Sequence, residues 1–274
     1  MKKQQARSID QTVWRDPLLP YAEFRSTKNS TLTYKKHSHS QLSIGYISQG
    51  ETLTLYQNKL WTLQQDQLIL IEPEKIHNCN PVENQSRSYC MLYLDKHWCL
   101  QQLSALYAQP VNNFSCLEVV FNDSVIASSM ATLMQSTEQN QQTRWLIEKV
   151  SMDILSAYCI VNSPHEALPS SVIEIRKYLL QNIEQPDCLA DIARHFSLSQ
   201  ETIIRSFSKQ LGISPKAYLN NVRIEKSKLL LQQGHTIIDV ALQLGFNDQS
   251  HFHKTFKNYC AMTPKQYQQV NSIQ

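Results

Sequence analysis

The last third of the chain contains one short pattern twice, and this repeat limits the folds open to it. Asp191-Ile192-Ala193 recurs 48 residues later as Asp239-Val240-Ala241, and Arg205-Ser206-Phe207 recurs 49 residues later as Lys254-Thr255-Phe256. In each copy an alanine stands in the middle of a predicted helix, where a second helix can cross closely, and a turn residue follows four positions later. The pattern predicts two copies of a helix-turn-helix unit.

The second helix of each unit is predicted to have one apolar face and one polar face. Ser199 is the expected N-cap of the first copy, and Asn247 or Asp248 that of the second. Apolar residues four apart would face the protein interior, while the residues between them would face outwards, where side chains can reach base edges in a DNA major groove. The inward residues are Ile203, Phe207, Phe252 and Phe256, and the outward residues are Glu201, Thr202, Arg205, Gln249, Ser250, His251 and Lys254.

Between the two units, the sequence from Ser214-Pro215 to Gly234 predicts a single helix with a serine cap and a proline in its first turn. About 19 residues at ~1.5 Å each span ~28 Å, and adjacent turns of the major groove lie about 34 Å apart. One helix-turn-helix pattern alone fits an ordinary helical hairpin equally well. Two copies joined by such a helix favour a DNA-binding domain.

Residues 189–267 resemble the AraC/XylS family of bacterial transcription regulators. The matching residues are Leu189-Ala190-Asp191-Ile192-Ala193, Ser199, Arg205-Ser206-Phe207, Gly212-Ile213-Ser214-Pro215, Tyr218, Arg223, Leu229-Leu230, Val240-Ala241, Gly245-Phe246, Ser250-His251-Phe252, Phe256-Lys257 and Thr263-Pro264. The resemblance implies an AraC-type DNA-binding domain over residues 170–274, a non-enzymatic regulator, and double-stranded operator DNA and RNA polymerase as partners. Activation of transcription is expected from the resemblance alone.

Four positions depart from the family pattern. Ser197 replaces the usual turn glycine, Ser227 a linker alanine, Ala261 a glycine after the second recognition helix, and Gln268 a closing arginine. These changes bear on local turn geometry and on one phosphate contact, and they leave the predicted fold unchanged.

Contacts to DNA are assigned residue by residue. Arg205 is the best candidate for reading guanine, because its planar guanidinium can donate to two acceptors at once. Lys209 and Lys257 are expected to contact phosphate or to remain solvated. The full set of expected DNA-contacting residues is Ser199, Glu201, Thr202, Ile204, Arg205, Lys209, Asn247, Gln249, Ser250, His251, Lys254 and Lys257.

Composition sets the outer limits of this interpretation. The 274 residues have room for two domains, and 42% hydrophobic residues can build two cores. The net charge of +3 comes from the part after position 164, where 12 Lys and Arg face 9 Asp and Glu. No apolar run is long enough for a membrane span, and the polar start does not resemble a signal peptide. A cytoplasmic protein without a membrane partner is therefore expected. The seven scattered cysteines are expected to be reduced thiols.

The first half of the chain has the alternating pattern of short β-strands. Strands are predicted at 31–34, 41–47, 51–56, 60–63, 67–71 and 89–94. Such a series, divided by turns, predicts a small β-barrel or sandwich. We expect a loose N-terminal arm at 1–22 and the barrel at 23–110.

Histidines in this region resemble a cupin motif. His37-x-His39 is followed by Gly50, and Ile71-Glu72-Pro73 leads to His77. In enzymatic cupins, matching histidines and a glutamate bind iron, manganese or nickel; here Ser43 stands where that glutamate is expected. The three histidines therefore fit a ligand pocket, a purely structural cluster or a working metal site, and regulators of this family usually have a metal-free barrel. We expect no metal or cofactor and an effector pocket formed by His37, His39, Tyr46, Trp61, His77, Met91 and Tyr93.

Helical periodicity follows the barrel. One helix is predicted after Asp123-Ser124 and another from Trp145 onwards, and the resemblance implies that residues 111–162 form a helical dimerisation region. Residues 163–169 have the composition of a linker. A capping box, Ser171-x-x-Glu174, is expected to start the DNA-binding domain.

The fold class predicted from the sequence is therefore α+β: a cupin-like barrel with helices, then an all-α domain with two helix-turn-helix units on a linker helix. The predicted function is a sequence-specific transcription regulator, a homodimer controlled by a small-molecule effector in the barrel. Two alternatives remain open: a metal-dependent cupin enzyme fused to a DNA-binding module, and a constitutive regulator whose barrel only supports dimerisation.

Overall fold

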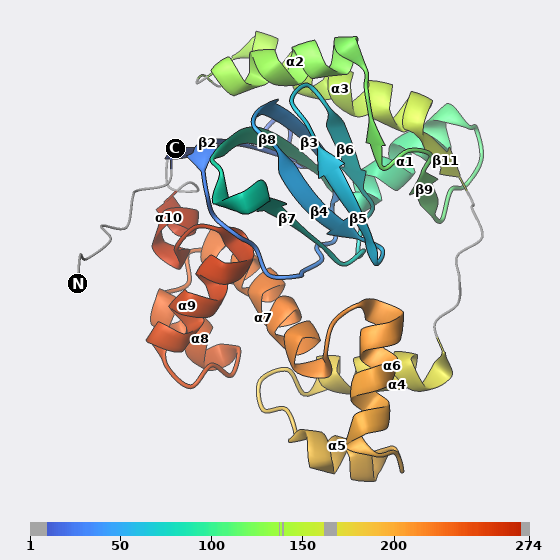
Figure 1. Ribbon diagram of the computed structural model, residues 1–274, viewed down its shortest axis with the longest axis vertical. Coiled ribbons are helices and arrows are strands. Elements are labelled where there is room, and N and C mark those ends of the chain that lie inside the picture. Colours follow the sequence, from blue (N-terminus) through green and yellow to red (C-terminus); the bar gives the residue numbers. More distant parts are fainter. Residues whose placement is uncertain (1–9, 137, 139, 162–168, 270–274) are drawn as a thin grey trace.

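The computed structural model describes residues 10–269 apart from 137, 139 and 162–168. Its N-terminal half contains two antiparallel sheets (Figure 1), a larger one with the strand order β1-β2-β8-β3-β6-β10 and a smaller one with the order β5-β4-β7. Their strands are β1 (Asp10–Arg15), β2 (Ala22–Ser30), β3 (Leu42–Gln49), β4 (Thr52–Tyr56), β5 (Lys59–Leu63), β6 (Leu68–Ile71), β7 (His77–Pro81), β8 (Arg87–Leu94) and β10 (Val120–Phe121). The predicted α+β class, with a barrel-like first half, is confirmed.

Three helices cover the outer face of the larger sheet: α1 (Lys96–Leu106), α2 (Ser124–Gln135) and α3 (Gln141–Tyr158). Figure 1 shows α2 and α3 as a layer above the strands. Strand β3 is buried on both faces, and its residues Leu42, Ile44 and Tyr46 point towards this layer. The Asp123 carboxylate caps α2 by accepting from the N–H groups of Val125 and Ile126, as the sequence predicted.

The inner face of the larger sheet packs against the smaller sheet. Side chains fill most of the space between them: Ile47, Tyr56, Leu63, Ile69, Ile71 and Tyr89. At Gly45 an added Cβ would lie 2.6 Å from Cγ2 of Ile69 and 2.8 Å from Sδ of Met91. The middle of the barrel is therefore closed by its own residues, so a ligand would have to bind towards one of its ends.

Residues 169–269 form a separate all-α part, which we call the reader. Its helices are α4 (Ser170–Gln181), α5 (Leu189–His195), α6 (Gln200–Leu211), α7 (Pro215–Gln232), α8 (Ile237–Gln243), α9 (Gln249–Cys260) and α10 (Pro264–Gln269). Helices α5 and α6 form the first helix-turn-helix unit, and α8 and α9 form the second. Each unit has its own hydrophobic core, and α7 contributes Tyr218 to the first and Ile224 and Leu231 to the second. The predicted repeat and its connecting helix are confirmed.

The structure corrects the expected N-terminal arm. Residues 10–15 form β1, which pairs with β2 from Asp10 opposite Lys28 to Arg15 opposite Glu23. Trp14 is buried in the barrel core, while Val13 packs against the core of the second helix-turn-helix unit. Residues 1–9 of the expected arm lie outside the described residues. A short strand at a sheet edge has few residues to show alternation, so its sequence signal is weak.

Other expectations about local structure were also wrong. Residues 31–34 are not a strand, whereas β2 and β7 were missed. Within 111–122, β9 (Phe114–Cys116) pairs with β11 (Cys159–Val161), and β10 joins the larger sheet, so this region is not wholly helical. Helix α4 begins after Pro169 without a side-chain cap, so the predicted capping box does not form. Most of the expected linker lies outside the described residues.

Across the described ranges, no helix has both the length and the apolar composition that a membrane span requires.

Candidate DNA-binding surface and effector site

Helix α6 packs Ile203 and Phe207 inside the protein and presents mainly polar side chains to solvent. Ile203 and Phe207 have no exposed surface. The Ser199 hydroxyl accepts from the Thr202 N–H at 3.1 Å and caps the helix, as predicted. The predicted contact residues on this unit are all exposed: Ser199, Glu201, Thr202, Ile204, Arg205 and Lys209.

Helix α9 repeats this arrangement. Phe252 and Phe256 are fully buried, and of the two predicted caps the structure uses Asp248, whose carboxylate accepts from the His251 N–H at 2.6 Å. The predicted contact residues of the second unit are also exposed: Asn247, Gln249, Ser250, His251, Lys254 and Lys257. His253, which the sequence analysis did not select, is exposed on the same helix.

Arg223 of α7 connects the two units. Its Nε and Nη2 donate to the carbonyl oxygen of Ile183 at 2.9 and 2.8 Å, and its guanidinium lies 5.5 Å from the ring centre of Phe246. Ile183 lies in the loop that leads from α4 into the first unit, and Phe246 belongs to the core of the second. A buried, charge-assisted contact of this kind fixes the orientation of two small cores that share one helix.

Two departures from the family pattern adopt left-handed backbone. Ser197, in the turn between α5 and α6, has φ = 51°, and Ala261, after α9, has φ = 56°. Glycine is the usual residue in this conformation because a Cβ adds strain. The turns keep the geometry that glycine would give, at a cost of roughly 1–2 kcal/mol each.

The barrel domain contacts the reader through the loop that carries His37 and His39. Between them, the Ser38 N–H donates to Oδ1 of Asn221 at 3.1 Å, and Nδ2 of Asn221 donates to the Ser38 carbonyl at 2.9 Å. Two further hydrogen bonds join this loop to the reader. Nζ of Lys36 donates to the Gly212 carbonyl, and the Lys35 N–H donates to the Asn258 carbonyl. We call this contact, together with the charged cluster described next, the seam.

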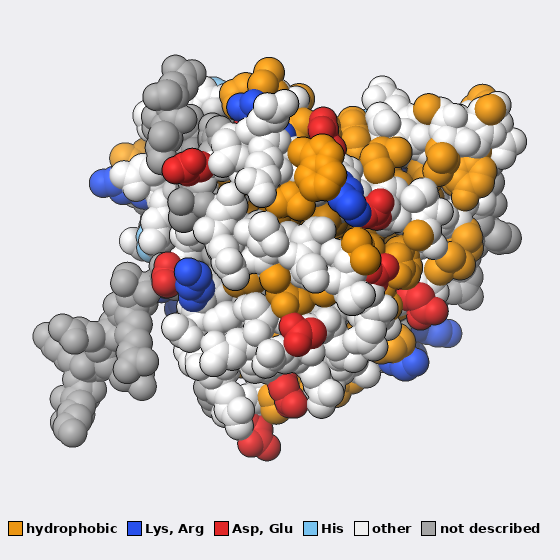
Figure 2. All heavy atoms as spheres, turned by 90° about the horizontal axis from the view of Figure 1, so that it is seen from above, with side chains coloured by type: hydrophobic (Ala, Val, Ile, Leu, Met, Phe, Trp, Pro, Cys, Tyr) orange, Lys and Arg blue, Asp and Glu red, His pale blue; other side chains and the backbone are white. Residues whose placement is uncertain are grey.

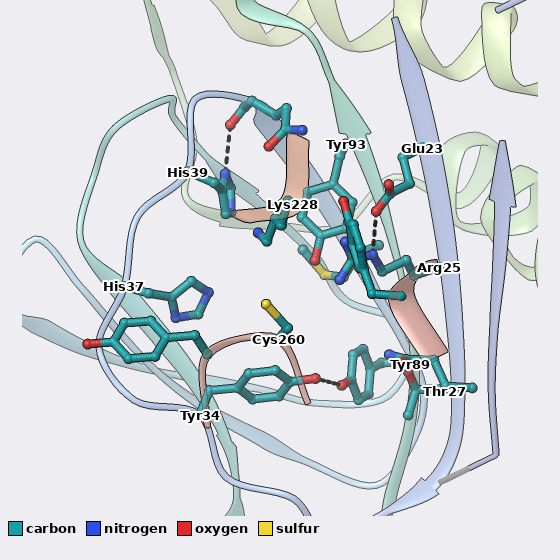
Figure 3. Close-up of a pocket in the computed structure, with 15 residues that line it drawn as sticks. Glu23, Arg25, Thr27, Tyr34, His37, His39, Tyr89, Tyr93, Lys228 and Cys260 are labelled. Carbon is teal, nitrogen blue, oxygen red and sulfur yellow. Dashed lines mark hydrogen bonds and ion pairs between the residues drawn. The ribbon is translucent and has the colours of Figure 1, made fainter. Parts of the chain in front are cut away.

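A buried group of charges forms the other part of the seam. Glu23 of β2 pairs with Arg15 and Arg25, and both guanidinium groups lie over the ring of Tyr267 in the reader, at 4.8 and 5.7 Å. Burial alone would raise the pKa of Glu23, but the two arginines hold it below its ordinary value. Burial alone would lower the pKa of Lys228 on α7, but Glu225 at 2.6 Å raises it. Figure 3 shows Glu23 and Arg25 together at one side of the pocket, with Lys228 lying between them and His39.

A cavity of about 40 Å³ lies at the open end of the barrel, within the seam. This volume holds a few water molecules or one ion. Four predicted pocket residues border it, namely His37, His39, Met91 and Tyr93, and His77 packs against the two histidines. The reader adds wall residues that the sequence analysis missed, because domain docking leaves no local pattern: Lys228, Tyr259, Cys260 and Tyr267.

Two predicted pocket residues lie elsewhere. Tyr46 is paired with Cys90 and therefore points to the helix-covered face of the sheet, where its hydroxyl donates to Asp66 at 2.8 Å. Trp61 packs in the inner barrel cluster beneath Lys59 and does not border the cavity. For Tyr46 the prediction named the wrong face of the strand.

A larger groove of about 910 Å³ runs between the barrel domain and the reader. Apolar residues and seven basic side chains line it, against three glutamates; the basic residues are Lys36, Lys75, Lys96, Arg176, Lys209, Lys226 and Lys228. The groove is large enough for a typical small-molecule ligand.

The three predicted histidines meet at one point. Ring centres of His37 and His77 are 4.4 Å apart, and those of His39 and His77 are 4.8 Å apart. Burial lowers the pKa of all three, that of His77 to about 4, so the imidazoles are neutral at physiological pH. As a group they can accept hydrogen bonds or coordinate a cation.

Two family models match this chain: an AraC-like ligand binding domain over residues 20–153 and a helix-turn-helix domain over residues 192–269. Together they span both halves described above. The chain belongs to the AraC family of transcription regulators. The HTH-type regulator YbfI of Bacillus subtilis is 26% identical over 247 residues, 88% of each chain. The activator RhaS of Klebsiella pneumoniae is 32% identical over 97 residues, 35% of each chain.

Solved structures of ToxT from Vibrio cholerae show the same fold. A point variant of ToxT from Vibrio cholerae, solved without ligand, superposes with a TM-score of 0.55 at 17% identity, covering 91% of this chain and 97% of that one. Wild-type ToxT bound to an unsaturated fatty acid gives a TM-score of 0.54 at 17% identity, covering 98% of each chain. The order of barrel, helices and reader in this AraC-family chain is thus that of a whole solved regulator.

Proposed function

We propose that this AraC-family regulator reads one operator with α6 and α9 together. The observation that carries the proposal is the pair of exposed polar helix faces held at two places on α7. Each helix is capped and is backed by fully buried apolar residues, Ile203 and Phe207 on α6 and Phe252 and Phe256 on α9. Eighteen residues of α7 span about 27 Å, close to the spacing of adjacent major-groove turns. We assign base reading to the outward residues of both helices, and phosphate contact to Lys209 and Lys257.

Arg205→Ala tests this assignment. We expect it to weaken binding to a duplex selected by the wild-type protein from a random pool by about 1–3 kcal/mol, and to relax preference at one base position. Fluorescence anisotropy with the selected duplex and a scrambled duplex measures both effects. Lys257→Ala is the contrasting variant, and it should lower affinity for both duplexes alike. It should also reduce the slope of log binding constant against log salt concentration by about 1 in magnitude. Equal losses on both duplexes for Arg205→Ala would contradict a base-reading role.

The effector is proposed to bind between the two halves. The enclosed cavity accepts little more than water, whereas the adjoining groove has room for a small molecule. Its excess of lysines over glutamates, together with apolar walls such as Ile76 and Leu211, favours an anion with an apolar body. ToxT has been solved with an unsaturated fatty acid, a ligand of that chemistry. A ligand that contacts both walls favours the arrangement that brings the walls together, which is how effector binding would alter DNA binding.

The helical layer is proposed to form a homodimer. Trp145 of α3 and Val125 of α2 expose 55% and 57% of their surface, and Figure 2, which looks onto this layer, shows hydrophobic side chains gathered on it. The occupant we propose is the same layer of a second copy. Trp145→Glu is expected to weaken the dimer about 30-fold, because a central aromatic contact contributes about 2 kcal/mol. Light scattering during size exclusion measures this; Leu242→Glu, at an exposed apolar residue of the reader, should leave the dimer intact.

The remaining parts of the proposal follow from DNA binding. RNA polymerase is the expected partner at a promoter, and activation is supported by the name of the relative RhaS. A regulator that binds chromosomal DNA works in the cytoplasm. We assign the chain no catalytic step, since relatives along its length are named as regulators. The filled middle of the barrel also fits a constitutive regulator in which the barrel only supports dimerisation. DNA-binding affinity that changes when a ligand occupies the groove would favour the effector-controlled regulator, and unchanged affinity would favour the constitutive one.

A further inference from the structure

The orientation of the three histidines is fixed by backbone carbonyl groups. Nδ1 lies 2.7 Å from the Lys35 carbonyl for His37, 3.1 Å from the Gln41 carbonyl for His39, and 2.9 Å from the Lys75 carbonyl for His77. A carbonyl oxygen only accepts, so each Nδ1 carries the proton and each Nε2 carries a lone pair. Ligating histidines in metal sites are held in the same way.

The backbone holds these rings in place. His37 and His77 exchange both main-chain hydrogen bonds, at 2.9 and 2.8 Å, and the His39 carbonyl accepts from the Glu74 N–H at 2.7 Å. The imidazole ligand atoms all lie within 4.8 Å of one another. Some point therefore lies within about 2.8 Å of all three atoms, so shifts of under about 1 Å give the ~2.1 Å bonds of a zinc–imidazole site.

We propose that His37, His39 and His77 bind one divalent first-row transition metal through their Nε2 atoms. Neutral imidazoles suit zinc, cobalt, nickel and iron(II), and three of them leave at least one position open. No thiol or carboxylate of the described residues joins the cluster, so hard cations such as magnesium, which prefer oxygen ligands, should not bind. This differs from the expectation from the sequence, in which the missing cupin glutamate and the resemblance to metal-free regulators together favour a barrel without metal.

The charges around the three histidines determine which kind of ligand would fill the open position on the metal. The cations that face it are Lys228 and Arg25, and each is paired with a carboxylate, Glu225 or Glu23. Without a metal, the Ser43 hydroxyl donates to Nε2 of His39 at 3.2 Å, and rotation of that hydroxyl would release the lone pair. The open position would adjoin the cavity that Lys228 lines, so an anionic or hydroxide ligand there would be stabilised by that ammonium group.

Untagged, chelator-treated full-length protein tests the site without DNA. We expect one Zn²⁺ per chain by mass spectrometric metal analysis after gel filtration. The midpoint of thermal unfolding should rise with Zn²⁺ or Co²⁺ and should not change with Mg²⁺. His37→Ala should lower Zn²⁺ affinity at least about 100-fold, since even supporting residues of metal sites contribute about 10–100-fold. His97→Ala, at an exposed histidine of α1, is the matched control and should behave as wild type.

A second readout keeps the test independent of how well the variants fold. Co²⁺ bound by three imidazoles gives visible d–d absorption in the wild-type protein, and one equivalent should saturate it. The proposal is overturned if wild-type protein shows neither this absorption nor stoichiometric zinc at micromolar concentrations, or if His37→Ala, with an unchanged apo circular dichroism spectrum, keeps wild-type affinity. This inference does not depend on the proposed DNA contacts, and Arg205→Ala should bind metal normally.

Discussion

Gly245→Ala is expected to destabilise the reader by about 3–4 kcal/mol and to abolish tight DNA binding. Gly245 has φ = 70°, and an added Cβ would lie 1.8 Å from the Glu184 carbonyl oxygen and 2.6 Å from Nη2 of Arg223. A backbone carbonyl cannot rotate away as a side chain can. The new methyl group would therefore push apart the two units that Arg223 joins. Urea unfolding followed by circular dichroism at 222 nm measures the loss.

Gly234→Ala is the matched control for this change. Gly234 has φ = 87°, and apart from its two chain neighbours no described residue has an atom within 4 Å of the added Cβ. It should cost only the strain of a left-handed alanine, about 1–2 kcal/mol, and leave DNA binding close to wild type. If the two alanine variants were equally stable, close packing between the units would not be what makes Gly245 necessary.

Glu23→Ala is expected to destabilise the barrel domain by about 3–5 kcal/mol, because it leaves Arg25 buried without its carboxylate. All four tryptophans, at positions 14, 61, 98 and 145, lie in the strands and helices that precede the reader, so fluorescence during urea unfolding reports on this half alone. The change should also loosen the stacking of both guanidinium groups on Tyr267. Asp153→Ala, which removes the partly exposed Lys149–Asp153 pair on α3, is the control and should cost at most about 1 kcal/mol.

The contribution of Glu23 should depend on pH in one direction. Its pKa in the folded protein lies below the ordinary value of 4.5, so its stabilising effect is complete above that value and is lost as the pH falls through the lower folded value. The difference between wild type and Glu23→Ala should therefore shrink on acidification below pH 4.5. A difference that stays constant down to about pH 2 would show that the carboxylate charge is not responsible.

The reader could be predicted in detail because its signals are local. A cap such as Ser199, a proline such as Pro215 and phenylalanines four apart each act within one or two turns of helix, and all of them are found where the sequence placed them. Strand β1 could not be found in this way, since its stability comes from pairing with β2 and from packing of Val13 on the reader. The same holds for Gly245, whose constraint is a carbonyl 61 residues away at Glu184.

The candidate ligand site was only partly visible in the sequence. Spacing identified His37, His39 and His77, but their tautomers depend on carbonyl groups that only the folded loop brings into place. Tyr46 was assigned to the pocket although both faces of β3 are buried, and alternation cannot tell two buried faces apart. The walls given by Lys228 and Tyr259 required knowledge of how the two halves dock.

The amide of Asn221 binds Ser38 as a neighbouring strand would, with one donor and one acceptor on the same backbone unit. A side chain of helix α7 thereby satisfies the main-chain N–H and carbonyl groups of Ser38 in the loop before β3. Because both bonds involve the same two residues, displacement of α7 by one helical turn, about 5.4 Å, breaks both of them at once. The barrel and α7 are therefore expected to separate at this contact in one step, without passing through a state that keeps one of the two bonds.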